Sequence, residues 1–151
     1  MLHIKINGVT NATHTHPILY LHDRNNPFCT ISFQNQAINF GGAAYSDVNT
    51  SQPFEMVMKK IVNGSVISYE VYARQNASDN FSYFGNVNTT VGWVYENRFE
   101  FYSSGGNSIA IDYVKVYNPK SDVALPNVNA AFASSDYALV KQLILTDYAV
   151  C

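Results

Sequence analysis

Hydrophobic and polar residues alternate with a period of two along most of the chain. In residues 2–7 every second residue, beginning with Leu2, is aliphatic, and the residues between are polar. This period is typical of strands that are buried on one face. The pattern therefore predicts an all-β chain of eight or nine short strands. The segments that carry it are residues 2–9, 17–22, 28–33, 37–40, 54–62, 66–74, 81–87, 95–102 and 108–117.

Polar and glycine-rich turns separate these segments. Residues 63–65 (Asn-Gly-Ser) are the clearest hairpin turn, because Asn-Gly supplies the left-handed dihedrals that a tight turn needs. Residues 34–36 form another turn, and Gly41 and Gly42 mark a bend or bulge. Short strands at regular spacing predict a two-sheet antiparallel β-sandwich over residues 2–117.

The pattern changes after Pro119. Residues 118–151 are interpreted as a linker and a C-terminal tail, and Pro126 argues against a central strand there. The run Ser134-Ser135-Asp136 could cap a helix that ends at Ile144. We expect a short helix or an irregular docked tail here, with a closing strand as the alternative.

Composition agrees with a β-rich domain. The 151 residues correspond to one domain, and Val and Ile together number 25 against seven Leu. Only 13% of residues are charged, and the net charge of -2 excludes nucleic acid or an acidic membrane surface as the main partner. No run of 18 apolar residues occurs, so no membrane insertion is expected.

Asn-x-Ser/Thr sequons are more frequent than chance would give. Six occur where the composition predicts roughly 2, which favours an extracellular or cell-surface protein with N-linked glycans. The N-terminal residues contain no continuous apolar stretch of the signal-peptide kind, so we expect a signal upstream of a fragment or, alternatively, a cytosolic form. Cys29 and Cys151 could form a disulfide or stay separate thiols. The sequons are Asn11, Asn49, Asn63, Asn76, Asn80 and Asn88.

No complete catalytic or metal-binding constellation is present in the sequence. His14, His16 and His22 lack further ligands, so we expect neither a metal nor another cofactor. Glu96 and Glu100 flank Arg98, which favours a salt-bridged strand face over a glycosidase pair. The chain is therefore expected not to be an enzyme. Trp93, the single Trp, could be a sugar platform, although a core position is the more common place for Trp.

Several segments, in order, resemble galectins. Residues 4–9 (Ile-Lys-Ile-Asn-Gly-Val) resemble their early strand and Gly-Val turn, and residues 19–22 (Leu-Tyr-Leu-His) resemble their sugar-binding strand ending in His. Residues 52–56 (Gln-Pro-Phe-Glu-Met) are similar to their Pro-Phe-Glu strand start. The final segment of the match is residues 109–116, and residues 111–117 also resemble the end of laminin-G-type modules. The resemblance spans residues 2–117 and implies a concanavalin-type β-sandwich that binds sugar. Its remaining segments are residues 69–73, 81–84 and 98–101.

The polar residues with which galectins bind galactose are largely replaced. His22 fits the family pattern, whereas Arg24 stands where Asn is expected and Asn26 where Arg is expected. Phe40 stands at the position of the stacking Trp, and Tyr45 at that of a sugar-binding Arg. The resemblance implies a lectin-like module that binds a glycan or glycoprotein through these five residues. Losing several fixed polar partners removes most discrimination, so the ligand is expected to differ from ordinary β-galactoside. The alternative is a protein-interaction or structural module that has lost sugar binding.

Overall fold

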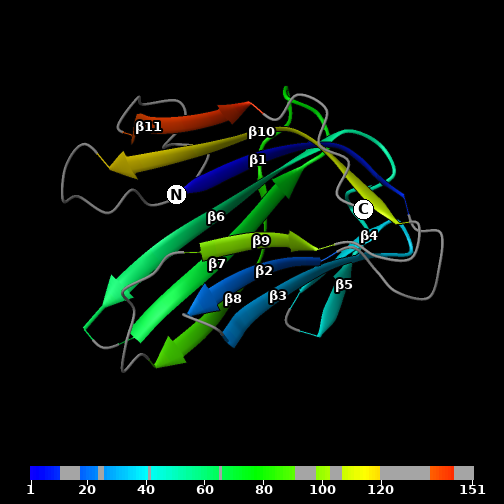
Figure 1. Cartoon of the computed structure of the whole chain (residues 1–151). Helices are drawn as coiled ribbons and strands as arrows, with labels where there is room; N and C mark the ends of the chain where they lie inside the picture. The colour runs from blue at the N-terminus through cyan, green and yellow to red at the C-terminus, as the bar shows by residue number, and fades with distance from the viewer. Residues whose placement is uncertain are drawn as a thin grey trace.

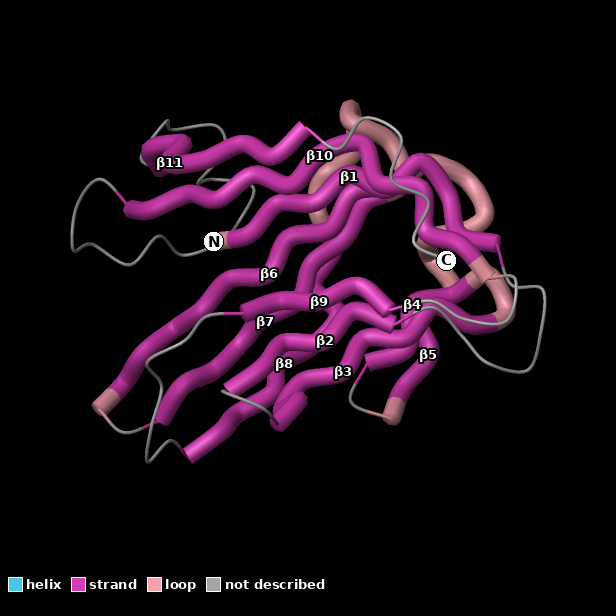
Figure 2. The backbone as a smooth tube through the Cα atoms, viewed as in Figure 1, coloured by secondary structure: helices cyan, strands magenta, loops and turns pink. Residues whose placement is uncertain are grey.

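The computed structural model shows an all-β chain arranged as two antiparallel sheets (Figure 1). No helix occurs among the residues that the structure describes, as the tube in Figure 2 shows. The described residues are 1–10, 18–23, 26–40, 42–64, 66–90, 98–102, 107–119 and 137–144.

The larger sheet has six strands in the order β11-β10-β1-β6-β7-β8. Strand β1 lies inside this sheet and pairs with both β6 and β10. The strands are β1 (Leu2–Thr10), β6 (Phe54–Asn63), β7 (Val66–Arg74), β8 (Ser82–Thr90), β10 (Ser108–Pro119) and β11 (Tyr137–Ile144).

The smaller sheet has five strands in the order β5-β4-β3-β2-β9. The chain visits the two sheets in turn, since β2 to β5 follow β1, and β9 lies between β8 and β10 in sequence. The strands are β2 (Ile18–Asp23), β3 (Asn26–Gln34), β4 (Ala37–Phe40), β5 (Ala43–Tyr45) and β9 (Arg98–Tyr102).

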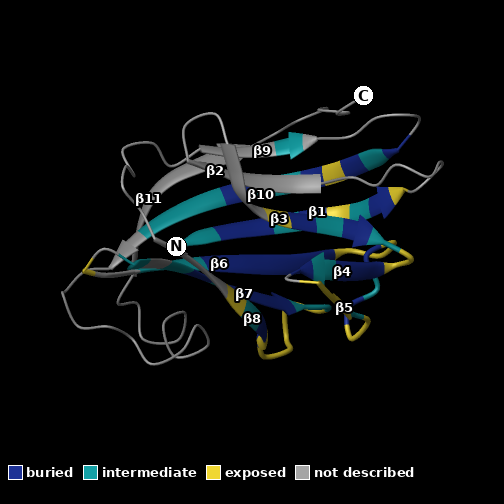
Figure 3. Cartoon of the chain, turned by 90° about the horizontal axis from the view of Figure 1, so that it is seen from below, coloured by how far each residue is buried: buried dark blue, intermediate teal, exposed yellow. Residues whose placement is uncertain are grey.

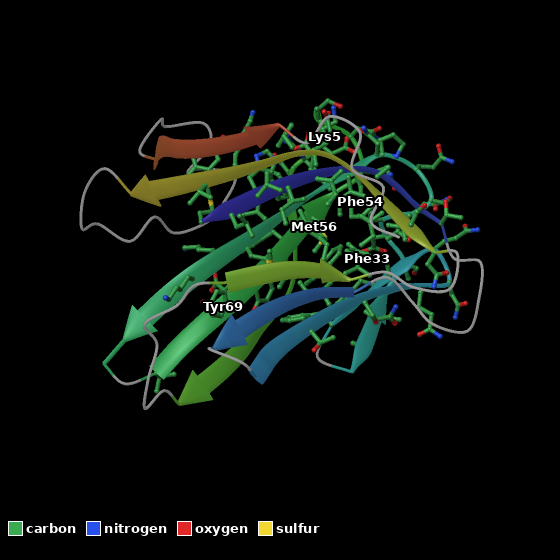
Figure 4. The ribbon with its side chains drawn as sticks, in the orientation of Figure 1. Lys5, Phe33, Phe54, Met56 and Tyr69 are labelled. Atoms are coloured by element: carbon green, nitrogen blue, oxygen red, sulfur yellow. The ribbon has the colours of Figure 1, made fainter. Side chains whose placement is uncertain are left out.

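One hydrophobic core joins the two sheets. Phe33 of the five-stranded sheet and Phe54 of the six-stranded sheet have ring centroids 5.9 Å apart. Phe33, Phe54 and Met56 lie in the layer between the sheets (Figure 4), and buried residues include most of β4 and the first half of β6 (Figure 3). Alternation explains this layer, because every second side chain of a strand points to the same face. The fully buried core includes Ile4, Ile6, Ile31, Ile38, Val71 and Val114.

The predicted all-β class is confirmed, and each of the nine predicted segments overlaps a strand in the described part of the chain. Two of the predicted turns can also be compared with the structure. Gln34 pairs with Ala37, and both residues of the loop between them, Asn35 and Gln36, have positive φ. Asn63 pairs with Val66 across the predicted hairpin turn. The short strand β5 was not predicted, because three residues are too few to show an alternation.

The helix or irregular tail expected near the C-terminus is wrong for residues 137–144, and the alternative of a closing strand is confirmed there. Residues 137–144 form β11, which pairs with β10 from Pro119 opposite Tyr137 to Tyr113 opposite Ile144. The apolar spacing there fits a helix, but the unpaired backbone edge of a twelve-residue strand provides hydrogen bonds that the sequence pattern does not reveal. Part of the predicted tail therefore belongs to the six-stranded sheet.

Candidate functional site

A β-bulge in β8 decides which side chains this strand presents outwards. Tyr72 of β7 pairs with Tyr83, and the next residue of β7, Val71, pairs with Gly85, so the register shifts by one residue at Phe84. Because of the extra residue, two residues lie between Tyr83 and Asn86. The side chains of Tyr83 and Asn86 are both exposed. The side chain of Phe84, which follows Tyr83, is buried in the core. Bulges of this kind re-aim side chains at functional surfaces.

Gly85 is required at the bulge for two reasons. Its φ of +135° is one that residues with a side chain rarely adopt. A Cβ atom at this position would also lie 3.3 Å from the hydroxyl oxygen of Tyr45 and 3.5 Å from Cε1 of Phe40. Tyr45 stacks on Phe84 with ring centroids 4.8 Å apart and planes at 5°. Side chains of β4 and β5 therefore pack directly against the bulge.

These contacts argue against the stacking role expected for Phe40. Its side chain is 3% exposed and belongs to the core, so its ring has no open face for a sugar. Tyr45 is half-buried and packs against the same core. Both side chains therefore act from inside, as the packing that holds the β8 bulge.

The outward face of β7 and β8 carries an exposed aromatic ring with polar neighbours. Tyr83 is 54% exposed and lies 5.3 Å from the ring of Tyr72 at an angle of 58°. Its hydroxyl donates a 3.3 Å hydrogen bond to Oδ1 of Asn86. Asn86 pairs with Glu70 across the two strands. We call Glu70, Tyr72, Tyr83 and Asn86 the tyrosine site.

Glu70 brings a negative charge to the tyrosine site. Its Oε2 accepts a 2.7 Å hydrogen bond from the hydroxyl of Tyr72 and lies 3.8 Å from Nζ of Lys59. Loss of hydration raises the pKa of Tyr83 most, and the charge of Glu70 and the phenol of Tyr45 raise it further. The Tyr83 hydroxyl therefore stays protonated and remains a donor at neutral pH. Such a set can stack on the C–H face of a sugar and hydrogen-bond its hydroxyls.

A buried charge network lies on the same outward face. It is centred on the cross-strand pair of Glu55 and Arg74, two residues along β7 from Tyr72. Oε2 of Glu55 accepts hydrogen bonds from Nη2 and Nε of Arg74, at 2.6 and 3.0 Å, and lies 2.9 Å from Nε2 of His3. The guanidinium of Arg74 also lies 4.3 Å from the ring centroid of Phe81. Phe81 and Tyr72 belong to one buried cluster with Val57. The network thus packs against the hydrophobic cluster that contains Tyr72.

The other predicted sugar-binding residues lie at one end of the five-stranded sheet. His22 of β2 is in register with Pro27 and Arg98, and Asn26 pairs with Asp23. Arg24 lies outside the described residues, as do Trp93, Glu96, His14 and His16. The backbone therefore brings His22 and Asn26 to one end of the β2–β3 hairpin, on the other sheet from the tyrosine site.

The sequons fall mostly in turns and at strand ends. Asn76 and Asn80 are exposed in the turn between β7 and β8. Asn49 is half-buried, and its Oδ1 accepts a 2.7 Å hydrogen bond from the hydroxyl of Ser51 in the same sequon. Asn63 ends β6 and Asn88 lies in β8. Asn11 and Cys151 lie outside the described residues, and Cys29 lies in β3.

Comparison with known proteins gives no match, whether to family models, to curated protein sequences or to solved structures. Within the described ranges, no three His, Cys, Asp or Glu side chains gather as a metal site would require. The same residues include no helix that could span a membrane.

The sequence pattern missed the tyrosine site. A simple alternation over residues 81–87 places Tyr83 and Gly85 on one face and Asn86 on the other. Gly85 was the available signal, because a glycine inside a strand suggests a bulge. A bulge at that point shifts the alternation by one residue and brings Asn86 to the face of Tyr83.

Replacing Gly85 tests the bulge. We expect Gly85→Ala to lower the free energy of unfolding by about 1–3 kcal/mol, because it adds both backbone strain and a Cβ contact. Tyr45→Phe removes the contacting oxygen and should reduce this cost by about 0.5 kcal/mol. Urea unfolding of the single and double variants measures the coupling. Gly64→Ala is the control, since Gly64 has φ +59° and open space around it. Equal coupling of Tyr45→Phe to both alanine variants would contradict the predicted contact.

The Glu55 network predicts a dependence of stability on pH. Burial alone would raise the pKa of Glu55, but the hydrogen bonds from His3 and Arg74 and the charge of Arg74 outweigh it and lower the pKa from 4.5 to about 2. The resulting stabilisation, about 3 kcal/mol, is complete above the unfolded-state pKa and is lost as pH falls through the folded one.

Urea unfolding between about pH 6 and about pH 2 measures this loss. The native chain should lose about 3 kcal/mol more than Glu55→Gln over that range. Ser46→Ala, at an exposed position without a titratable group, should keep the native pH dependence. A Glu55→Gln chain that loses as much stability as the native chain would show that Glu55 does not carry the effect.

Proposed function

We propose that the chain is a noncatalytic carbohydrate-binding module and that the tyrosine site binds the sugar. The exposed ring of Tyr83, next to the cross-strand pair of Glu70 and Asn86, is the observation that carries this proposal. An open aromatic face stacks on the apolar face of a pyranose, while a carboxylate and an amide orient its hydroxyls. Oε1 of Glu70 makes no hydrogen bond within the described part of the chain, so it can accept one from a ligand.

A galectin-like β-sandwich is the fold in which we place this module. Two antiparallel sheets with a shared core, and a first strand beside β10, support this proposal. The site, however, is not the one that galectin motifs would give, because Phe40 and Tyr45 face inwards. We therefore assign sugar binding to the six-stranded sheet. The ligand is proposed to differ from ordinary β-galactoside.

Protein binding is the second candidate function. Exposed tyrosines are also common at the centres of protein interfaces. In that case Tyr83 would contact a partner protein, and the chain would be an interaction module without sugar binding.

A glycan array of the full chain, produced without N-glycans, separates the two functions. We expect binding to a subset of neutral glycans, weakened at least tenfold by Tyr83→Ala. Tyr83→Phe keeps the ring and should retain most of the affinity. Thr30→Ala, an exposed position of β3 on the other sheet, is the control. Binding that survives Tyr83→Ala would reject the tyrosine site, and absence of binding to every glycan would favour the interaction module.

The module is proposed to be secreted or displayed at the cell surface. The excess of sequons and the exposure of Asn80 support this location. Intact mass of the protein from its native source should fall after N-glycosidase treatment, by at least one glycan. An Asn80→Gln variant should lose most of that difference, because Asn80 is an exposed sequon of the β7–β8 turn. An unchanged mass of the native protein would contradict the proposed location.

A further inference from the structure

A hollow of about 590 Å³ lies on the same outward face as the tyrosine site. It is lined by Lys5 and Glu55, which pair with each other between β1 and β6, and by residues of the loops beside them, including Gln52 and Asn76. Lys5 lies on the side of β1 away from Phe54 and Met56 (Figure 4). The hollow is thus separate from the core between the sheets.

Hydrogen bonds within the loops fix the wall of the hollow. Nε2 of Gln75 donates to the carbonyl of Pro53 at 2.7 Å, and its Oε1 accepts from the backbone N–H of Asn49 at 2.7 Å. The backbone N–H and Nδ2 of Asn76 both donate to Oδ2 of Asp79, at 3.0 and 2.9 Å. A ligand would therefore meet a wall whose shape is already set.

Polar groups that line the hollow still have hydrogen-bonding capacity. Among the described residues, the side-chain amide of Gln52 makes no hydrogen bond, and Oδ1 of Asn76 accepts none. Nζ of Lys5 binds Oδ2 of Asp112 at 2.8 Å, which uses one of its three N–H donors. An amide, a carbonyl oxygen and an ammonium are the partners that sugar hydroxyls need.

The charges at the hollow are already compensated. Asp112 neutralises Lys5, and Arg74 neutralises Glu55. A charged ligand would gain little there, since each side chain already has its counter-charge. The hollow therefore suits a neutral, hydroxyl-rich ligand.

The hollow and the tyrosine site are close enough for one ligand to reach both. Glu55 pairs with Arg74, and Tyr72, two residues earlier in β7, pairs with Tyr83. Two strand spacings across the sheet and two residues along it separate Glu55 from Tyr83 by about 12 Å. We propose that the hollow is a second saccharide subsite and that the ligand is a neutral oligosaccharide spanning it and Tyr83. This inference rests on the proposed sugar binding at the tyrosine site.

A length series of saccharides tests the second subsite. The probes are oligomers of one to four units of each neutral hexose and N-acetylhexosamine, titrated into the full chain produced without N-glycans. We expect affinity to rise at least tenfold from the monosaccharide to the trimer or tetramer. The side-chain amide NMR signals of Gln52 and Asn76 should shift with the longer oligomers and stay in place with the monosaccharide.

Variants separate this inference from the proposed function. Gln52→Ala and Asn76→Ala should each remove much of the gain with length and leave monosaccharide affinity unchanged, whereas Tyr83→Ala should weaken every length. Thr30→Ala should change neither. Equal affinity for all lengths, with binding still dependent on Tyr83, would overturn the second subsite alone. Absence of binding at every length would overturn both proposals.

Discussion

The packing of Phe40 and Tyr45 against the backbone of Gly85 is the contact on which the candidate site depends. It joins the five-stranded sheet to the edge of the six-stranded sheet, and it leaves no room for a side chain at the bulge. Because of the bulge, the side chains of Tyr83 and Asn86 lie on the same face of β8. Core packing on one side of the sheet thereby determines the chemistry that the other side presents. An exposed ring on a strand is also held more rigidly than one on a loop, which suits stacking.

Most of the charged side chains that the structure describes lie on the outward face of the six-stranded sheet. Glu55, Arg74 and His3 form a buried network, Lys5 pairs with Asp112, and Glu70 lies near Lys59. Because nearly every one of these charges has a counter-charge, the face offers hydrogen bonds without a strong net field. This arrangement fits neutral, hydroxylated ligands better than nucleic acid or an acidic surface. The low charge content of the sequence and the proposed ligand class are thus consistent.

Alternation of side chains was enough to predict most of the fold and too little to predict the site. Ile31 and Phe33 face the core as their spacing requires, and the turn at residues 34–36 follows from its polar residues. The strand β11 depends on a partner strand distant in sequence, which local pattern does not contain. The tyrosine site depends on a shift of one residue at Gly85, caused by side chains of β4 and β5. Sequence resemblance pointed to Phe40 and Tyr45 as ligand contacts, whereas their packing makes them supports.

Intermolecular nuclear Overhauser effects between the chain and a bound saccharide test the central claim most directly. The Tyr83 ring signals can be assigned by comparison with Tyr83→Phe. We predict contacts from the Tyr83 ring protons to the C–H protons on one face of a sugar unit, and none from Thr30 or Ser32 on the other sheet. Contacts to Thr30 and Ser32, with none to Tyr83, would contradict the assignment of sugar binding to the six-stranded sheet.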